Sequence, residues 1–516
     1  MLAAGALSAP LDCSTSIRRL CPKAPLAAVA CAALVGLGGC GSDTADDAAS
    51  PLDNALGYLP KDAPLVASID TDLSGDQLSA VGKILDRFAF GDSVKKSVKD
   101  LVEQEGGALN DIKPVLGNEF VVGATNARSL TDGSGDQDFI GAIQAKSKDE
   151  LAKAIRAGKS KREGKRNGAI LYKDDDGSLF AIKGDVLVVA GSRNLLKSAV
   201  DQRVADGRLT EDTFDKATAV LPKDALLRVG GDLQTLLASD PSTRAARRIK
   251  WVNALRTFGV TASFTDGEAD VGFRLNTDSG DLTDEDLPIA SGTSSPAVVD
   301  RATDIVTGIK DPTQIVDFAE SAAQAIDPSG FGDYAQAKRT IEKQLGVSIQ
   351  NDLLDQLKGG VSITLGARGK FGARARVKNP AAFDRTLAKL GKVLPAVARS
   401  VVGEPVGYAK PKQGGDYYAL TTAKKEGVVY GVIHGVFVLA NDPSLASQLS
   451  SEDTKAVSGA AGSVVLKADA GQLVQQLLGL GQLGGALVAG PFGDLTGSMS
   501  ADTSGITGNF KLRFDG

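Results

Sequence analysis

The chain has 516 residues with 42% hydrophobic and 23% charged side chains, which are the proportions of a globular protein and exclude a fibrous or wholly disordered chain. At about 150 residues per domain, this length allows two to four domains. The formal net charge of −5 argues against a nucleic acid as the partner.

The first forty residues have the layout of an export signal. A basic stretch, residues 18–23, precedes an uncharged apolar run, residues 24–37. This run is too short to span a bilayer, which takes about 20 residues. It closes with Leu37-Gly38-Gly39-Cys40, which resembles the lipobox of bacterial lipoproteins. The resemblance implies cleavage between Gly39 and Cys40 and lipidation of the Cys40 thiol, whereas the alternative is an ordinary cleaved signal with a chance cysteine.

Cysteine usage favours the lipoprotein interpretation. The four cysteines all lie within the first forty residues, and the chain after Cys40 has none. The thiol of Cys40 is therefore best explained as a lipid attachment point. We expect a lipoprotein signal peptide over residues 1–39 and an acidic flexible tether over residues 40–57. The protein would then lie on the extracytoplasmic side of the cell membrane, anchored by its lipidated N-terminus.

The hydrophobic period predicts the elements that follow the tether. Apolar residues at helical spacing predict helices over residues 78–88 and 94–102, and short apolar runs predict strands over residues 120–124, 139–145, 179–182 and 186–190. Gly184-Asp185, between the last two strands, is typical of a two-residue hairpin turn. Strands in adjacent pairs, separated by helices, predict the α+β class, with mainly antiparallel sheets and helices packed on one face.

Two segments of this region have the composition of ligand sites. Residues 132–138 place oxygen ligands at alternate positions as a calcium loop does, but the acidic residue expected at position 12 is Ile143. We interpret this segment as a Gly/Asp hairpin loop. Residues 159–166 carry five bases, which we expect at a helix end and in a loop. Anionic lipid or polymer could bind there, although a solvated charge run is the commoner case.

Comparison of the chain with itself indicates an internal duplication. Several segments recur in the same order: Phe90-Gly91-Asp92 as Phe331-Gly332-Asp333, Leu116 as Leu357, Ala145 before a helix as Val377, residues 186–190 as 436–440, and Phe273-Arg274-Leu275 as Phe510-Lys511-Leu512. We expect two homologous α+β halves, residues 58–278 and 295–516. An acidic linker, residues 279–294, joins them. Residues 59–63 also recur as residues 221–225, either as a shared turn or as an older duplication.

Three segments carry the resemblance to a known family. They are Tyr58–Pro64 with the strand that follows it, Asn110–Gly117, and the strand–helix junction Gly184–Leu196. Their pattern resembles a bacterial envelope family catalogued as domain of unknown function 3352. The resemblance implies an exported or membrane-attached protein, and it brings no activity and no site residues.

One contrast between the two halves suggests a surface for a ligand or partner. The first half has a basic helix face near an aromatic residue, and the second half has an uncharged stretch, residues 477–492, at the corresponding place. The residues concerned are Arg244, Arg247, Arg248, Trp251, Leu477, Leu480 and Leu483. We expect these segments to form a surface that contacts a membrane, an apolar ligand or a partner protein. Drift in a peripheral helix is the alternative.

Other motifs predict no chemistry. Residues 479–484 spell a dinucleotide-binding fingerprint, but they follow a helical pattern and not a strand, so we expect no such cofactor. The single histidine, His434, corresponds to Gly184 of the predicted hairpin turn and should be a solvent-exposed turn residue. One histidine also excludes a His-clustered zinc site, and we expect no metal.

These observations favour a lipid-anchored binding or scaffolding protein of the cell envelope without catalytic activity. A lipid, a glycan or an envelope protein would be its partner. A carrier of lipid or another hydrophobic ligand is the first alternative. The second alternative is an envelope hydrolase that uses carboxylates, which requires two facing acids.

Overall fold

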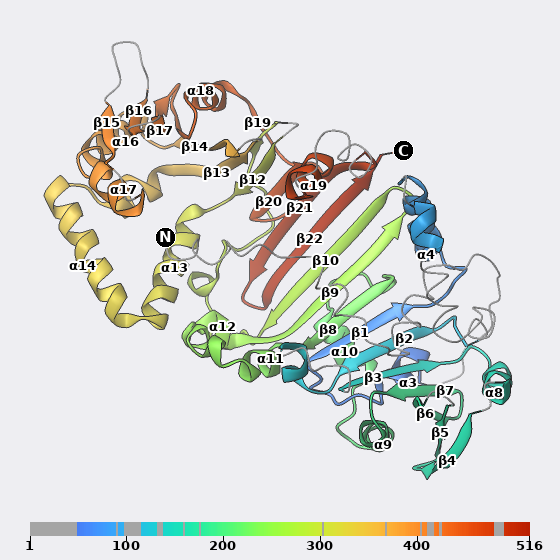
Figure 1. The fold of residues 1–516 in the computed structure, drawn as a ribbon. Coiled ribbons are helices and arrows are strands. Elements are labelled where there is room, and N and C mark those ends of the chain that lie inside the picture. Colours follow the sequence, from blue (N-terminus) through green and yellow to red (C-terminus); the bar gives the residue numbers. More distant parts are fainter. Residues whose placement is uncertain are drawn as a thin grey trace. The chain divides into compact units, whose positions relative to one another are not determined.

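The computed structural model describes residues 49–515, except residues 89–90, 97–114, 132–137, 158–159, 175–176, 302–303, 367–368, 403–404, 410–416, 423–425 and 479–489 (Figure 1). The chain divides into two compact units. The first consists of the residues up to Asp86, Phe90–Lys216 and Leu226–Gly231, and the second of Arg87–Ala89, Ala217–Ala225 and Asp232–Gly516.

The first unit is an antiparallel sheet with helices. Its elements are α3 Pro51–Leu56, β1 Leu65–Asp70, α4 Asp76–Asp86, β2 Glu119–Ala124, α7 Ala127–Thr131, β3 Phe139–Gln144, α8 Lys148–Ala157, β4 Lys161–Arg166, β5 Ala169–Lys173, β6 Leu179–Lys183, β7 Val186–Ala190, α9 Arg193–Gln202, α10 Glu211–Ala217 and β8 Leu227–Asp232. The strands hydrogen-bond in the order β8-β1-β2-β3-β7-β6-β5-β4, and every pair is antiparallel.

Helix α3 covers one face of this sheet. The Ser50 side chain caps the helix by accepting from Asp53 N, and proline stands in the first turn, where its missing N–H costs no hydrogen bond. Leu52 and Leu56 point inward and pack in one core cluster with residues of the sheet, including Val121 and Ala142. The helix therefore closes the core over β2 and β3.

The second unit contains the remaining elements. They are α11 Leu233–Ser239, η2 Pro241–Arg244, η3 Ala246–Arg248, α12 Lys250–Ala254, β9 Leu255–Thr265, β10 Glu268–Thr277, η4 Asp284–Asp286, β11 Val298–Val299, β12 Ile305–Ile309, α13 Pro312–Ile326, α14 Pro328–Leu345, α15 Ile349–Asp352, η5 Leu354–Gln356, β13 Leu357–Leu365, β14 Phe371–Val377, α16 Pro380–Leu390, α17 Leu394–Val402, β15 Gly407–Ala409, β16 Tyr418–Thr421, β17 Glu426–Ile433, β18 Val436–Ala440, α18 Pro443–Ser451, β19 Thr454–Lys455, β20 Val464–Asp469, α19 Ala470–Leu478, β21 Phe492–Asp502 and β22 Gly505–Phe514.

The main sheet of the second unit is also antiparallel. Its order is β9-β10-β22-β21-β20-β12-β13-β14-β18-β17-β16-β15, and β11 pairs separately with β19. The long strands β9, β10, β22 and β21 lie side by side in Figure 1. Gly508 of β22 faces Phe273 of β10, whose ring stacks on Phe510 at 6.1 Å between centroids. Trp251 is 8% exposed and belongs to the core cluster at one end of these strands.

The structure confirms the mixed α+β class and the antiparallel sheet. The four predicted strands correspond to β2, β3, β6 and β7, and the first predicted helix is α4. The turn at Gly184-Asp185 is confirmed, with Gly184 at a φ of 67°. Most of the second predicted helix and of the calcium-like loop lies outside the described residues.

Two expectations about local structure were wrong. Residues 161–166 form strand β4 and not a helix end, because Asn167 and Gly168 both adopt positive φ (45° and 85°) and make a tight hairpin turn to β5. Residues 241–254 do not form one helix. Instead they form η2, η3 and the short α12, with Asp240 capping η2 by accepting from Ser242 N.

Candidate functional site

The second unit contains a pocket of about 310 Å³ on strands β13 and β14, which we name the cationic pocket. It is lined by Ala297, Lys358, Gly359, Gly360, Ser362, Arg374, Ala375, Arg376 and Thr454. Small-molecule sites in proteins usually measure about 300–1,000 Å³, so the volume is sufficient for a small ligand.

A bulge in β13 shapes one wall of this pocket. The register between β13 and β14 shifts between Lys358 and Val361, where Gly359 and Gly360 are inserted with φ values of 75° and 96°. A Cβ on Gly360 would lie 2.4 Å from the carbonyl oxygen of Ile309. Only glycine therefore fits at residue 360, and the bulge places two residues without side chains at the pocket wall.

The strand register gathers three cations in the pocket. Arg374 and Arg376 lie two residues apart on β14, so they share one face of the sheet. On β13, Lys358 lies directly opposite Arg376, and Ser362 lies directly opposite Arg374. Like charges directly opposite each other on an antiparallel pair destabilise the sheet. The pocket thus concentrates positive charge that neighbouring strands do not balance.

Arg374 is the most buried of these cations, with 9% of its surface exposed. Its Nε is buried without a hydrogen-bond partner among the described residues, and the arginine forms no salt bridge with them. Burial, and then the positive charge of Arg376, lower the pKa of Arg374 below its ordinary value. A buried polar group without a partner is costly, so this guanidinium has donors to offer a ligand.

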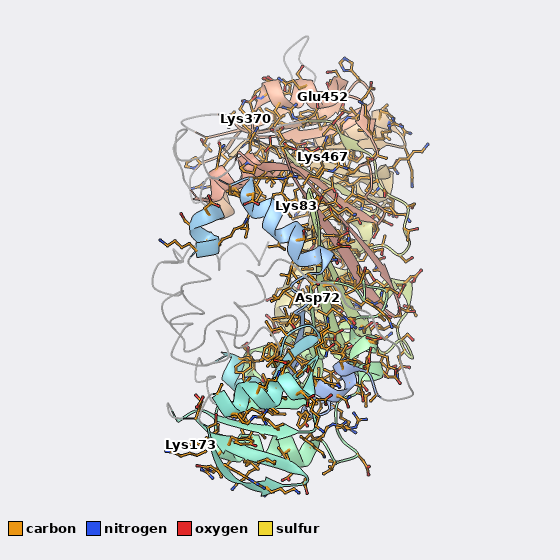
Figure 2. The ribbon with its side chains drawn as sticks, turned by 90° about the vertical axis from the view of Figure 1, so that its right-hand side faces the viewer. Asp72, Lys83, Lys173, Lys370, Glu452 and Lys467 are labelled. Atoms are coloured by element: carbon orange, nitrogen blue, oxygen red, sulfur yellow. The ribbon has the colours of Figure 1, made fainter. Side chains whose placement is uncertain are left out.

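Two acidic residues lie near the pocket. The negative charges of Asp453 and Glu452 favour the charged guanidinium and therefore oppose the lowering of the pKa of Arg374. Glu452, labelled in Figure 2, binds Arg301 through one oxygen, because its Oε1 accepts from Arg301 Nη1 at 2.6 Å, whereas its Oε2 is buried without a hydrogen-bond partner among the described residues. Arg301 also pairs with Asp304. Ser362 Oγ accepts from the backbone N–H of Val299 at 3.1 Å, which leaves its hydroxyl hydrogen free for another acceptor.

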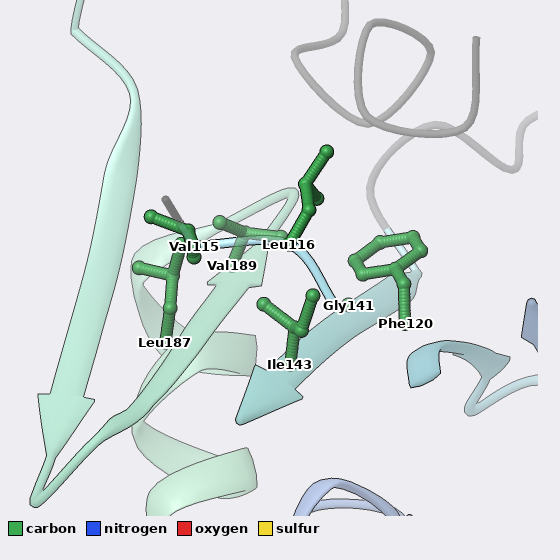
Figure 3. A pocket seen from close by; sticks show the side chains of 7 residues that line it. All are labelled: Val115, Leu116, Phe120, Gly141, Ile143, Leu187 and Val189. Carbon is green, nitrogen blue, oxygen red and sulfur yellow. The ribbon is translucent and has the colours of Figure 1, made fainter. Parts of the chain in front are cut away.

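The first unit has a second, smaller pocket of about 70 Å³ on the sheet (Figure 3). Its lining is apolar and consists of Val115, Leu116, Phe120, Gly141, Ile143, Leu187 and Val189. The volume lies well below the range of about 300 Å³ and above in which small-molecule sites usually fall. We therefore take the cationic pocket as the candidate functional site.

Two carboxylates of the first unit face each other. Asp70 of β1 lies directly opposite Glu119 of β2. Burial raises the pKa of both carboxyl groups. Side chains directly opposite each other on an antiparallel strand pair are close enough to interact. Asp70 accepts a hydrogen bond from Asp72 N at 2.8 Å. Neither residue lines the cationic pocket or the apolar pocket of the first unit.

The structure places the predicted surface residues in different environments. Arg244 and Arg248 are exposed, in η2 and η3, and Arg248 Nη1 donates to Ile326 O at 3.4 Å. Trp251 is buried and packs edge-on against Phe318. Arg247 is partly exposed, so only the three arginines of this group reach the surface. Leu477 lies in α19, whereas Leu480 and Leu483, like Gly39 and Cys40, lie outside the described residues.

His434 occupies the turn between β17 and β18, as expected. It is exposed, has a φ of 51°, and its Nδ1 lies 3.4 Å from Ser450 Oγ. Among the residues that the structure describes, no group of three or more His, Cys, Asp or Glu side chains could hold a metal ion. Within the same part of the chain, no helix has the length and apolar character needed to cross a bilayer.

Sequence reasoning missed the residues of the cationic pocket. Two signals could have indicated them. Adjacent glycines inside a strand-like run, Gly359-Gly360, are typical of a bulge or a close backbone approach. The alternation Arg374-Ala375-Arg376 places two bases on one strand face, which is unusual on a face that also carries core residues. The proximity of Arg374 and Arg376 to Lys358 and Thr454 depends on pairing between strands that lie apart in the sequence, β13 with β14 and β11 with β19.

The fold defines a mixed α+β protein built on antiparallel sheets. A family model described as a protein of unknown function, DUF3352, matches residues 25–394, and the chain belongs to this family. No match was found among curated proteins. Crystal forms III, I and IV of TP0453 are similar at 9%, 12% and 11% identity, each with a TM-score of 0.23; they cover 44%, 46% and 43% of this chain and 82%, 81% and 80% of TP0453. Similarity at this level supports no conclusion about function.

Proposed function

We propose that this chain is a non-catalytic binding protein of the cell envelope, anchored outside the cytosol through a lipidated Cys40, and that it binds an anionic ligand in the cationic pocket. The observation that carries the binding role is Arg374, which is 9% exposed and whose Nε is buried without a hydrogen-bond partner among the described residues. A cation that is desolvated without a partner costs free energy, which an anionic ligand offsets when it binds. The leader and the tether of the sequence support the anchored location.

We also propose that the halves 58–278 and 295–516 arose by duplication. The strand order β8-β1-β2-β3-β7-β6-β5-β4 has the same connectivity as β20-β12-β13-β14-β18-β17-β16-β15, which supports this proposal.

The strand register adds independent support for the duplication. The difference in residue number between Leu116 and Leu357 makes Ser362 the equivalent of Val121. The difference between Ala145 and Val377, which comes from a separate sequence match, makes Arg374 the equivalent of Ala142. Val121 lies opposite Ala142 in the first half, and Ser362 lies opposite Arg374 in the second. Two sequence matches that were found separately therefore lead to the same cross-strand pair.

The anchor is tested by the intact mass and location of the chain expressed in a bacterium. We expect loss of residues 1–39, an acyl-bearing modification on Cys40, and recovery in the membrane fraction. A Cys40→Ser variant should lose both the modification and the membrane association. A chain that keeps its leader, or an unmodified Cys40 at the new terminus, contradicts the anchored location.

Binding is tested with the full-length Cys40→Ser chain, whose unfolding temperature is measured with citrate, inorganic phosphate, glucose and spermidine at constant ionic strength. Ligands that bind the native state raise this temperature. We expect a rise with an anion, no rise with glucose or spermidine, and loss of the rise in Arg374→Met. An effect of the neutral sugar alone, or an anion effect that persists in Arg374→Met, contradicts the proposed binding role.

A further inference from the structure

The first unit uses a helix to fill the place that corresponds to the cationic pocket. Helix α3 packs on β2 and β3, and its Leu52 and Leu56 share a core cluster with Val121 and Ala142. All four of these side chains are at most 3% exposed. In the first half, the positions equivalent to Ser362 and Arg374 are thus apolar and covered.

The second unit has no helix at the corresponding place. Residues 291–297, which precede β11, are all described and form no helix. The two positions that are apolar under α3 are here a serine and an arginine, and Ala297 remains exposed at the pocket. Strand β11 occupies part of this place, since it packs on β12 and β13 and Val299 N–H donates to Ser362 Oγ. The room that remains beside β11 forms the cationic pocket, which hydrogen-bond donors line.

We infer that the cationic pocket binds the phosphate group of a small phosphorylated molecule. This inference rests on the proposed function and specifies its ligand. The organic part of the ligand would contact the uncharged side chains of Ala297 and Thr454, which also line the pocket.

The arrangement of donors selects phosphate over a single carboxylate. Lys358, Arg374 and Arg376 approach from two strands, and Ser362 adds a hydroxyl hydrogen. A carboxylate has two coplanar oxygens and one charge, which one arginine fork satisfies. A phosphate monoester carries about −1.5 to −2 charges at pH 7 and three acceptor oxygens, so it can neutralise several cations at once.

The phosphate group could come from a soluble metabolite or from a phospholipid headgroup. The same donors recognise both, since each presents phosphate oxygens. A chain tethered to a membrane would encounter headgroups at high local concentration. The experiment therefore has separate arms for the two sources.

The first arm titrates the full-length Cys40→Ser chain with inorganic phosphate and with glycerol 3-phosphate by calorimetry. The second arm measures sedimentation with vesicles of phosphatidylcholine, with and without phosphatidic acid, whose headgroup is a phosphate monoester. Arg374→Met should weaken phosphate binding about tenfold or more, because charged hydrogen bonds are lost. Lys358→Gln, at an exposed position, should weaken it about two- to fivefold. The control Lys343→Gln, on the exposed face of α14, removes the same charge and should leave binding unchanged.

The outcomes separate this inference from the proposed function. Binding to phosphate, or only to vesicles that contain phosphatidic acid, that falls in Arg374→Met supports the phosphate site and identifies its source. Binding of citrate that depends on Arg374, without binding of either phosphate probe, overturns the phosphate inference and leaves the anion-binding function standing. If the Arg374→Met variant binds the anions as strongly as the chain with Arg374 does, both the phosphate inference and the anion-binding function are overturned. Arg374→Met should fold, since replacing an unpaired buried charge by an apolar group is often neutral or stabilising.

Discussion

Gly508 allows the neighbouring strands β10 and β22 of the second unit to pack around an aromatic ring. It lies opposite Phe273, and a Cβ at residue 508 would lie 2.0 Å from Cε1 and 2.4 Å from Cζ of that ring. The ring has little freedom to move away, because it stacks on Phe510 and packs against the core cluster of Trp251. Gly508→Ala should therefore destabilise this unit.

The magnitude follows from two opposing effects. The φ of Gly508 is not positive, so alanine meets no backbone strain, and replacing a strand glycine gains about 0.5–1 kcal/mol. An extra methyl group in filled space costs about 1–3 kcal/mol, and here it meets ring atoms at less than van der Waals distance. We expect a net loss of about 1–2 kcal/mol in the free energy of unfolding.

Trp251 provides the assay. It is the single tryptophan of the chain and lies in the core cluster against which Phe273 packs, so its fluorescence in urea reports the unfolding of this unit. The measurement is repeated in a Phe273→Ala background, where the ring is absent and Gly508→Ala should be neutral or stabilising. An equal loss in both backgrounds would refute the steric explanation, because coupled residues must show an interaction energy in the double-mutant cycle.

Two further predictions concern strained or buried residues. Val220 has a φ of 64° and is 77% exposed, and this left-handed conformation costs a β-branched residue about 1–2 kcal/mol. Asparagine tolerates the same conformation better, so Val220→Asn should raise the free energy of unfolding by about 0.5–1 kcal/mol, measured by Trp251 fluorescence in urea. The matched control is Val271→Asn, at an exposed valine of β10 in the same unit without positive φ, and a gain of the same size there would contradict the explanation. Burial, and then the charges of Asp70 and Glu211, raise the pKa of Glu119 above its ordinary 4.5, although a backbone hydrogen bond opposes this shift. A raised folded-state pKa means that ionised Glu119 destabilises the fold at neutral pH, so Glu119→Gln should melt at a higher temperature than the parent at pH 7, followed by circular dichroism. The difference should shrink as the pH falls through the raised pKa and vanish below 4.5; a difference that grows towards acid pH would show the opposite shift.

The local sequence pattern was sufficient to predict four strands of the first unit, β2, β3, β6 and β7. Strand β7, for example, is a continuous apolar run that ends next to a Gly-Asp turn, and both features depend only on neighbouring residues. The same reasoning failed at β4, where the Asn167-Gly168 turn outweighs the composition of a basic, solvated segment. It also failed around Arg244–Trp251, because the extended backbone of Ile249 (φ −70°, ψ 125°) separates η3 from α12 and because Trp251 is buried in the core.

The sequence by itself determined the family, the α+β class, the positions of β2, β3, β6 and β7, and the repeated segments, because these depend on periodicity and on motifs that are contiguous in the chain. It also supports the expectation of an exported, anchored protein. Tertiary structure alone decided that Lys358, Arg374 and Arg376 share one pocket with Ala297 and Thr454. That arrangement depends on the β13 bulge, on the register of β13 with β14, and on the pairing of β11 with β19. Such contacts join residues far apart in the chain, and the hydrophobic period of a single strand does not specify its partner.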